Sequence, residues 1–550
     1  MNAWLKAAAA GCVTAIPLIA HAASQAEAIP AEERLGTVSF PVSCAPSVQA
    51  SFNRGVALLH DFWYEEARPQ FERILKADPG CSMAHWGLAM SGFHQIWDRP
   101  NQATMARGWR EIEAAQAHSA GTARERAYIA ALGEFFKPGT NDYQVRIDAY
   151  SAAMGQLYAA HPEDVDAGAF YALSLLAAET PSDTSLNQER KALEVLSPLW
   201  VKYPDHPGLV HYIIHSCDSP PLAPKGLAAA RAYGKVAPSG PHAVHMPGHI
   251  FARLGLWQED IAANRASVEA SRAAEARNLS GGMDQFHSDD FLVYAYLQSG
   301  QEQMARKVVA EANAAMAHYE SMPGMSPDQY MDGMFPYYRM KLPVFVALET
   351  RDWTSALALE PIRSAPPETQ VIVYWARTIA AGHLRRASEA HHDLESYDAL
   401  IDQIRKGRHA YYAEGIGVKI SRGELLGWTA FADGELPVAL QHMRDSADLQ
   451  DKVGQGEVDI PAREMLADML LESNQPQQAL AEYRRALELS PNRFNGLYHA
   501  GRAAEASGDA VSARSYFATL LMTTEQGAHS TRPELAHAKE FIGSATVGKN

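Results

Sequence analysis

Residues 467–517 read ADMLLESNQPQQALAEYRRALELSPNRFNGLYHAGRAAEASGDAVSARSYF, and this stretch determines the fold. It places a small residue, a second small residue, an aromatic ring and a proline at fixed offsets: Ala467, Ala479, Tyr483 and Pro491. The first three residue classes recur 34 positions later: Gly501, Ala513 and Phe517. Small residues let two antiparallel helices approach closely, the ring fills the gap against the next pair, and proline ends the second helix. The stretch therefore predicts consecutive helix–turn–helix units.

The same offsets occur near the other end of the chain: Gly55, Ala67, Phe71 and Pro79. Gly427 and Ala439 add a unit in front of residues 467–517. The alternating pattern typical of strands is nearly absent. A 34-residue repeat of this kind resembles the tetratricopeptide repeat (TPR) family. The resemblance implies an all-α, TPR-like α-solenoid, whereas the repeat alone says little about function.

A longer resemblance covers the region from Val38 to about Trp257. It rests on SFPVSC at 39–44, LLHDFWYEEARPQFERIL at 58–75, HPGLVHYIIHSCDSPPLA at 206–223 and PHAVHMPGHIFARLGLW at 241–257. This region is similar to a group of exported bacterial TPR-repeat proteins. The likeness implies export, a solenoid fold and a disulfide between Cys44 and Cys81, and it implies no particular activity.

The first 22 residues have the features of an export signal. Lys6 precedes an apolar stretch over residues 7–20, and Ala20-His21-Ala22 forms a small-x-small cleavage site. We therefore expect a periplasmic or secreted protein. After the signal peptide (1–22) we expect a divergent TPR-like solenoid (23–420), regular TPR repeats (421–522) and a C-terminal tail (523–550). No later stretch has the ~18 apolar residues that a membrane-spanning helix needs.

Charge and cysteine content narrow the range of partners. The 550 residues include 48 Lys and Arg against 64 Asp and Glu, so the net charge is −16. This acidic balance argues against nucleic acid and anionic membranes as partners. The four cysteines include no C-x-x-C pair, so any metal site must use histidines and carboxylates. Outside the cytoplasm, a bridge between Cys44 and Cys81 around the first helical hairpin would contribute about 3–4 kcal/mol.

Two histidine pairs follow the repeat. His211 and His215 are matched 34 residues later by His245 and His249. Residues spaced i, i+4 share one helix face, and neighbouring helices in a repeat pack about 8–10 Å apart. We therefore expect the four imidazoles to meet in one patch. The TPR resemblance implies that these repeat positions, the fifth and ninth, face a ligand in the concave groove.

Further polar residues extend this row. His242 lies at the second position of its unit, and the following unit has His287, Asp290 and Tyr294 at its second, fifth and ninth positions. Near the N-terminus, His60 and His94 are also 34 residues apart. Both could line a ligand groove, or each could bond a loop carbonyl beside a packed tryptophan.

The histidine row supports three interpretations. His211, His215, His245 and His249 could bind a transition metal (Zn, Cu or Fe), with Asp290 as a further ligand or an orienting acceptor. The same histidines could instead hydrogen-bond a protein, peptide or small ligand without metal, or satisfy one another inside a crowded solenoid. The sequence best fits an exported TPR-repeat binding protein with a metal site.

A metal-dependent enzyme with an open coordination position is the alternative function. Asp290 or Tyr294 would then be the nearest groups able to move protons. The H-E-x-x-H motif of zinc proteases is absent, because Tyr212 and Met246 occupy its second position.

Overall fold

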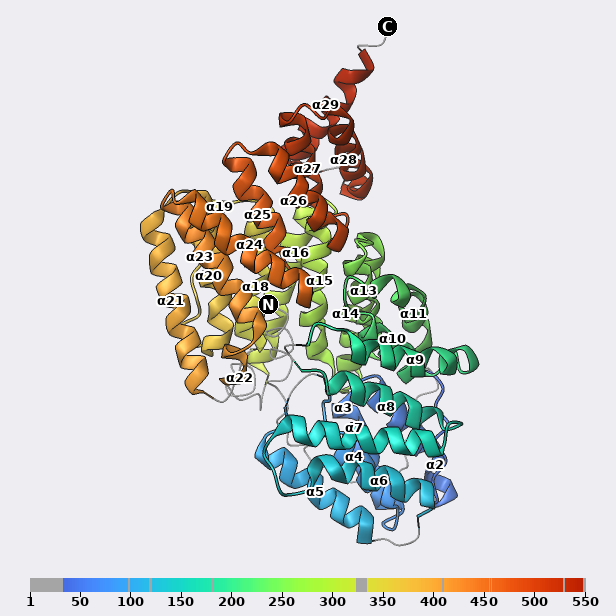
Figure 1. The fold of residues 1–550 in the computed structure, drawn as a ribbon. Helices are drawn as coiled ribbons and strands as arrows, with labels where there is room; N and C mark the ends of the chain where they lie inside the picture. Colours follow the sequence, from blue (N-terminus) through green and yellow to red (C-terminus); the bar gives the residue numbers. More distant parts are fainter. Residues whose placement is uncertain are drawn as a thin grey trace.

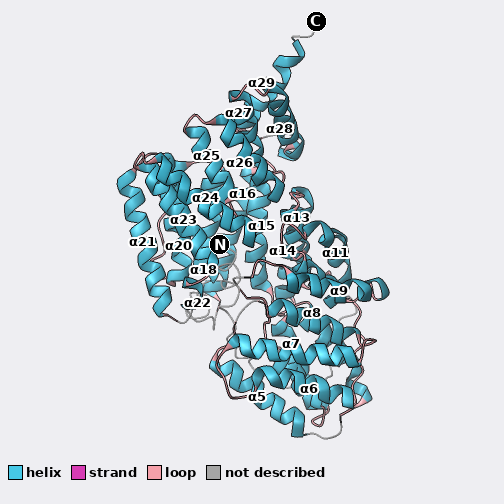
Figure 2. Ribbon diagram, in the orientation of Figure 1, coloured by secondary structure: helices cyan, strands magenta, loops and turns pink. Residues whose placement is uncertain are grey.

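The computed structural model describes residues 33–96, 99–117, 121–180, 183–322, 334–407, 410–454, 456, 458–527 and 530–547. Across these ranges the regular structure consists of helices, without a strand (Figures 1 and 2). The predicted all-α fold is therefore confirmed. The signal peptide predicted over residues 1–22 lies outside the described residues.

The N-terminal half of the chain forms antiparallel helical hairpins, which lie in the lower part of Figure 1. Its helices are η1 (Pro46–Val48), α2 (Gln49–His60), α3 (Tyr64–Ala77), α4 (Ser82–Met90), α5 (Gln102–Ala117), α6 (Ala123–Phe136), α7 (Tyr143–Ala160), α8 (Val165–Ala177), α9 (Asn187–Lys202), α10 (Pro207–Ser216), α11 (Ala223–Val236), α12 (Pro241–His245), α13 (Pro247–Arg253) and α14 (Trp257–Ala276).

The C-terminal half continues the same arrangement toward the C-terminus at the top of Figure 1. Its helices are η2 (Gly282–Asp284), α15 (Gln285–Gln298), α16 (Glu302–Ser321), α18 (Met334–Glu349), α19 (Trp353–Leu357), α20 (Pro367–His383), α21 (Ala387–Lys406), α22 (Ala410–Ala413), α23 (Ile416–Ala432), α24 (Leu436–Val453), α25 (Ala462–Glu472), α26 (Pro476–Leu489), α27 (Phe494–Ala506), α28 (Ala510–Thr523), η3 (Glu525–Gly527) and α29 (Pro533–Val547).

The repeat residues pack as their pattern predicts. The ring of Phe71 lies between two helices: a Cβ at Gly55 would be 2.7 Å from it and a Cβ at Gly87 only 2.4 Å. Phe517 lies equally close to Gly501, at 2.4 Å. Glycine is required at these positions because any side chain would displace the ring. The alternation of small and aromatic residues thus fixes the distance between helices.

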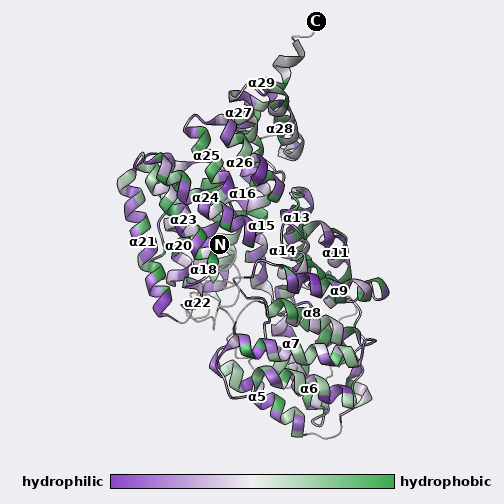
Figure 3. Cartoon of the chain, in the orientation of Figure 1, coloured by the Kyte–Doolittle hydropathy of each residue, from purple (hydrophilic) through white to green (hydrophobic). Residues whose placement is uncertain are grey.

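The buried apolar residues form two clusters, and hydrophobic and hydrophilic residues are interspersed along the helices (Figure 3). One cluster runs from Leu35 to Ala274 and the other from Ala252 to Ala538. The core is therefore divided around α13 and α14. No helix in the described ranges is both long enough and apolar enough to cross a lipid bilayer.

Cys44 and Cys81 form a disulfide in the structure, with Cα atoms 4.9 Å apart. It ties the segment before α2 to the start of α4, and Cys217 is a buried free cysteine. We expect a thiol reagent in denaturant to label Cys217 alone in the processed chain before reduction. Reduction should then lower the free energy of unfolding by about 3–4 kcal/mol, since the bridge restricts the unfolded chain. Three reactive thiols before reduction would contradict this prediction.

Candidate functional site

Six histidines from four helices converge where the two apolar clusters meet. His211 and His215 lie on α10, His242 and His245 on α12, His249 on α13 and His287 on α15. They form two groups, within each of which the potential ligand atoms all lie within 4.8 Å of one another. We call His211, His215 and His242 the first triad, and His245, His249 and His287 the second triad. The two triads combine the predicted pairs with the two predicted edge residues.

The repeat explains why each triad contains these residues. In both cases the fifth and ninth positions of one unit meet the second position of the next unit. The second pair departs from the expected single helix, because Pro247 separates α12 from α13. Proline lacks an N–H and its ring crowds the preceding turn, so the helix is interrupted there. His245 and His249 nevertheless approach as closely as the first pair: the Nε2 atoms are 2.9 Å apart in both.

Four of the six rings have an outer nitrogen in a hydrogen bond: His211, His245, His249 and His287, whose Nδ1 lies 3.4 Å from the hydroxyl of Tyr338. The Nδ1 of His211 donates to the carbonyl oxygen of His60, at 2.6 Å. His60 is the last residue of α2, and carbonyls at a helix end have no partner within the helix. This contact orients His211 with its Nε2 toward the centre of the triad.

The second triad is held by side chains instead. The Nδ1 of His249 donates to Asp218, at 3.0 Å, and the Nδ1 of His245 donates to Oδ1 of Asn264, at 2.6 Å. The amide of Asn264 is oriented because its Nδ2 donates to the backbone oxygen and to Oδ1 of Asp260. Oδ1 of Asn264 can then only accept, so the proton of neutral His245 is on Nδ1.

This tautomer has a direct consequence for the pair His245 and His249. In the neutral state both rings carry their proton on Nδ1, so each Nε2 presents a lone pair. These two lone pairs face one another across 2.9 Å. Two acceptors at hydrogen-bond distance repel each other unless a cation is shared between them. The geometry at this point therefore suits a shared proton or a metal ion.

The site is buried between aromatic rings rather than open in a groove. His211 is 0% exposed and His245 2%, whereas the His249 side chain is 12% exposed. The ring of Phe62 lies 4.4–5.6 Å from the three rings of the first triad, centroid to centroid. Phe291 lies 4.8–5.4 Å from those of the second. The end of α2 and helix α15 cover much of the cluster, whereas His215, His249 and His287 are partly exposed.

Burial keeps several of these imidazoles neutral. Desolvation lowers the pKa of His211 to about 3 and holds that of His242 well below its usual range. It also lowers the pKa of His60 to about 4, although the hydrogen bond to Asp166 opposes the effect. Neutral imidazole is the form that binds metal ions.

These shifts predict acid sensitivity of the metal-free protein. In the unfolded chain His60 and His211 take up protons near pH 6.5, whereas in the folded chain they stay neutral down to about pH 4 and 3. The unfolded state therefore binds more protons in this window, and stability falls as the pH decreases. Each group contributes a slope of up to about 1.4 kcal/mol per pH unit. Asp284 and Asp289, whose pKa values burial raises to about 8, act in the opposite direction, so the two histidines are tested by comparison. Between pH 7 and 5 the urea midpoint of wild type should fall more than that of His211→Asn, and equal changes would contradict the prediction.

The buried carboxylate of Asp166 holds the last residue of α2, His60, next to the first triad. Asp166 accepts hydrogen bonds from Nε2 of His60, at 2.9 Å, and of His206, at 3.3 Å. The Nδ1 of His60 accepts the hydroxyl proton of Tyr212, at 2.9 Å. His60 thus acts through its backbone carbonyl on His211 instead of lining a ligand surface, which corrects the predicted ligand-binding role.

Three other predicted residues lie outside the two triads. Asp290 pairs with Lys341 of α18 in the interior, and this contact directs its carboxylate away from the role of metal ligand. The hydroxyl of Tyr294 donates to the carbonyl of Asp459 and is bonded by Arg493, within the C-terminal core. His94 is buried with its ring stacked on Tyr64, 4.5 Å between centroids. The row of polar residues predicted from the sequence therefore contributes to the triads only as far as His287.

Sequence reasoning missed the residues that hold the outer nitrogens. Asp218 follows the helix bearing the first pair and also accepts from Arg253, at 3.0 Å. The sequence could have indicated Asp218, because it lies three residues after His215 and a carboxylate just after such a histidine pair can reach the neighbouring helix. Asn264 lies within the ordinary pattern of α14 and offered no signal.

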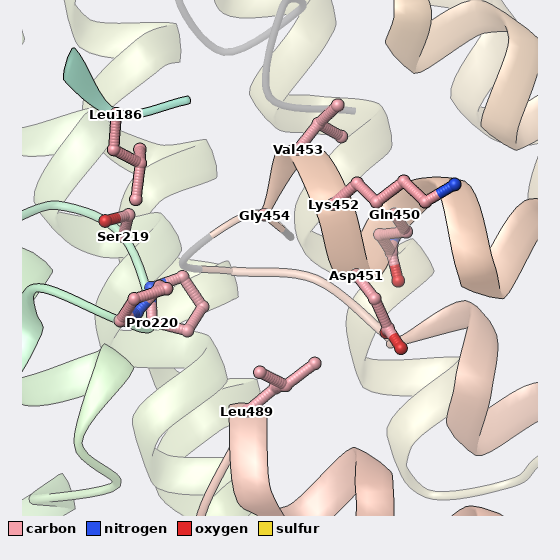
Figure 4. Close-up of a pocket in the computed structure, with 10 residues that line it drawn as sticks. Leu186, Ser219, Pro220, Gln450, Asp451, Lys452, Val453, Gly454 and Leu489 are labelled. Carbon is pink, nitrogen blue, oxygen red and sulfur yellow. The ribbon is translucent and has the colours of Figure 1, made fainter. Parts of the chain in front are cut away.

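A separate pocket lies between the segment after α10 and the C-terminal end of α24 (Figure 4). Its lining includes Ser219, Pro220, Lys452 and Gly454, and none of the six histidines. The six-histidine cluster and this pocket therefore lie at different places in the molecule.

The comparisons with known proteins agree with the packing of the helices. The sequence profile of a tetratricopeptide repeat family matches residues 64–95 and 464–530. The chain therefore contains tetratricopeptide repeats in these two stretches. Such repeats suggest a protein-binding scaffold. No curated protein matches the chain in sequence.

Solved structures similar to this chain include a human IFIT1 dimer with m7Gppp-AAAA, at 10% identity and a TM-score of 0.35, covering 85% of this chain and 88% of that one. Another is a structure of Naa15/Naa10 bound to HypK-THB, at 12% identity and a TM-score of 0.23, covering 89% of this chain and 73% of that one.

Proposed function

We propose that this protein is an exported TPR-repeat binding protein that holds a transition metal in its six-histidine cluster. The observation that carries the proposal is the pair His245 and His249, whose Nε2 lone pairs face each other at 2.9 Å while both Nδ1 atoms donate elsewhere. A metal ion with nitrogen ligands at about 2.0–2.1 Å resolves this repulsion.

A shared proton is the competing account of the same geometry. It would turn one ring into an imidazolium, whose charge is costly to bury at a site where His245 is 2% exposed. Asp218 could stabilise such a charge through His249, but its carboxylate is already paired with Arg253 at 3.0 Å. A metal ion also accounts for the third ring of each triad, which a shared proton does not require.

The held outer nitrogens favour a metal site over simple packing. Metal-binding histidines generally donate their second ring N–H to a carboxylate or carbonyl, which fixes the ring and the tautomer. His211, His245 and His249 all do so, with the acceptors His60 O, Asn264 Oδ1 and Asp218 Oδ2. Protein or peptide partners would bind elsewhere on the solenoid surface, since the histidines are largely buried.

Elemental analysis of the mature protein, purified without added metal or chelator, tests the proposal. We expect at least one equivalent of zinc, copper or iron per chain, and a lower metal content in the double variant His245→Ala/His249→Ala. His161→Ala, which changes a histidine on the surface, is the matched control and should retain the metal. A wild-type protein without metal that also fails to bind added Zn(II) would refute the proposal.

Removing the acceptor of His245 should weaken metal binding without removing a ligand. In Asn264→Ala the ring loses the contact that fixes its tautomer, and the affinity for Zn(II) should fall about 10- to 100-fold. Competition with a chromophoric chelator measures this change. Asn313→Ala on the exposed face of α16 is the control and should leave the affinity unchanged. Equal affinities of Asn264→Ala and wild type would contradict the assigned role.

A further inference from the structure

The six histidines form two equivalent ligand sets, and this equivalence determines how many ions they bind. We infer that the cluster holds two metal ions side by side, one in each triad, as a dinuclear centre with only imidazole ligands. The inference rests on the proposed function and adds the number of ions, their separate ligand sets and their mutual proximity.

The ligand atoms are arranged for two ions rather than one. A single ion bound by six nitrogens at about 2.1 Å would hold all of them within about 4.2 Å of each other. The histidine nitrogens instead separate into two groups of three, each within 4.8 Å. Each group has the three nitrogens that one ion needs.

Each triad has its own complete surroundings. The first has Phe62 against its rings and the carbonyl of His60 on an outer nitrogen, while the second has Phe291, Asn264 and Asp218. The repeat generates this equivalence, because both triads use the fifth and ninth positions of one unit and the second position of the next. An accidental group of histidines would not recur at the same three repeat positions of consecutive units.

The two triads are neighbours. His242 of the first and His245 of the second both lie on α12, with ring centroids 6.0 Å apart. His215 and His249 approach similarly, at 6.4 Å. We therefore expect ions bound in the two triads to be close enough for their unpaired electrons to interact.

The ligand chemistry favours copper or zinc. Neither triad contains a carboxylate or a thiolate, so the ions preferred are those that imidazole suits, and copper(II) binds nitrogen sites most tightly among the divalent first-row metals. Three protein ligands leave a further coordination position on each ion for a water or an exogenous ligand.

Copper titration of the full processed chain, stripped with a chelator, tests the inference. After desalting we expect two equivalents of Cu(II) per chain in wild type and in the control His161→Ala, and one equivalent in each of His242→Ala and His287→Ala. Magnetic coupling should make the integrated electron paramagnetic resonance signal of wild type smaller than its copper content, whereas the two one-copper variants should show their full signal. Circular dichroism checks that the variants remain helical.

The outcomes separate the two proposals. One equivalent in wild type, lost completely in both His242→Ala and His287→Ala, would overturn the dinuclear centre and leave the proposed metal site intact. Two equivalents with a full, uncoupled signal would overturn the proximity of the ions. No bound copper and no bound zinc would refute the proposed function itself. The wild-type count does not depend on whether any variant folds.

Discussion

Loading the stripped protein with Zn(II) should stabilise the folded state by about 4 kcal/mol at a free metal concentration of about 1,000 times the dissociation constant. The six histidines lie on α10, α12, α13 and α15, and these helices come together only in the folded chain. A metal bound by the histidines therefore stabilises the folded state. Calorimetry should show a higher melting temperature, and addition of a chelator should reverse the increase.

The double variant His245→Ala/His249→Ala should respond much less to Zn(II), because one of the two triads loses two of its three ligands. The side chain of His161 is 38% exposed, and the variant His161→Ala should respond like wild type. An equal increase in all three proteins would show that zinc stabilises the fold elsewhere.

Replacing Phe71 with alanine should destabilise the N-terminal repeats by about 3–5 kcal/mol. The ring is fully buried, packs against Phe52 with centroids 5.5 Å apart, and fills the space next to Gly55 and Gly87. These glycines have no side chains that could fill the cavity. Hydrogen exchange of α2 to α4 should accelerate by roughly a hundredfold or more.

Phe71→Leu retains most of the buried volume and should cost clearly less than Phe71→Ala. Val201→Ala, at a residue 82% exposed, is the surface control and should leave exchange in α2 to α4 unchanged. Equal exchange rates in Phe71→Ala and wild type would show that the ring does not join the first two repeats.

The sequence was sufficient for the architecture because the repeat places the same residue types at the same distances. Gly501 and Phe517 were identified from spacing alone, and the structure packs them as expected. Spacing also identified all six histidines, including His242 and His287 at the second position of their units. Their division into two triads follows from the same register, since a second-position residue contacts the fifth and ninth residues of the unit before it.

The environment of the histidines depended on contacts that no repeat encodes. The end of α2 supplies Phe62 and the His60 carbonyl from about 150 residues away in sequence, and a periodic pattern cannot predict such a contact. Asp290 lies at the fifth position of its unit, as His211 and His245 do, but its carboxylate forms an ion pair with Lys341 of α18. Pro247 shows a further limit, because the break it makes between α12 and α13 leaves the distance between His245 and His249 unchanged from that of the first pair.

X-ray absorption at the metal edge of the loaded, full processed chain tests the central claim most directly. We predict a first shell dominated by about three nitrogen atoms per metal near 2.0–2.1 Å, with the outer-shell scattering of imidazole rings. In the double variant His245→Ala/His249→Ala the imidazole contribution per chain should decrease by at least two rings. A first shell of oxygen or sulfur, or an unchanged imidazole contribution in the variant, would contradict the account.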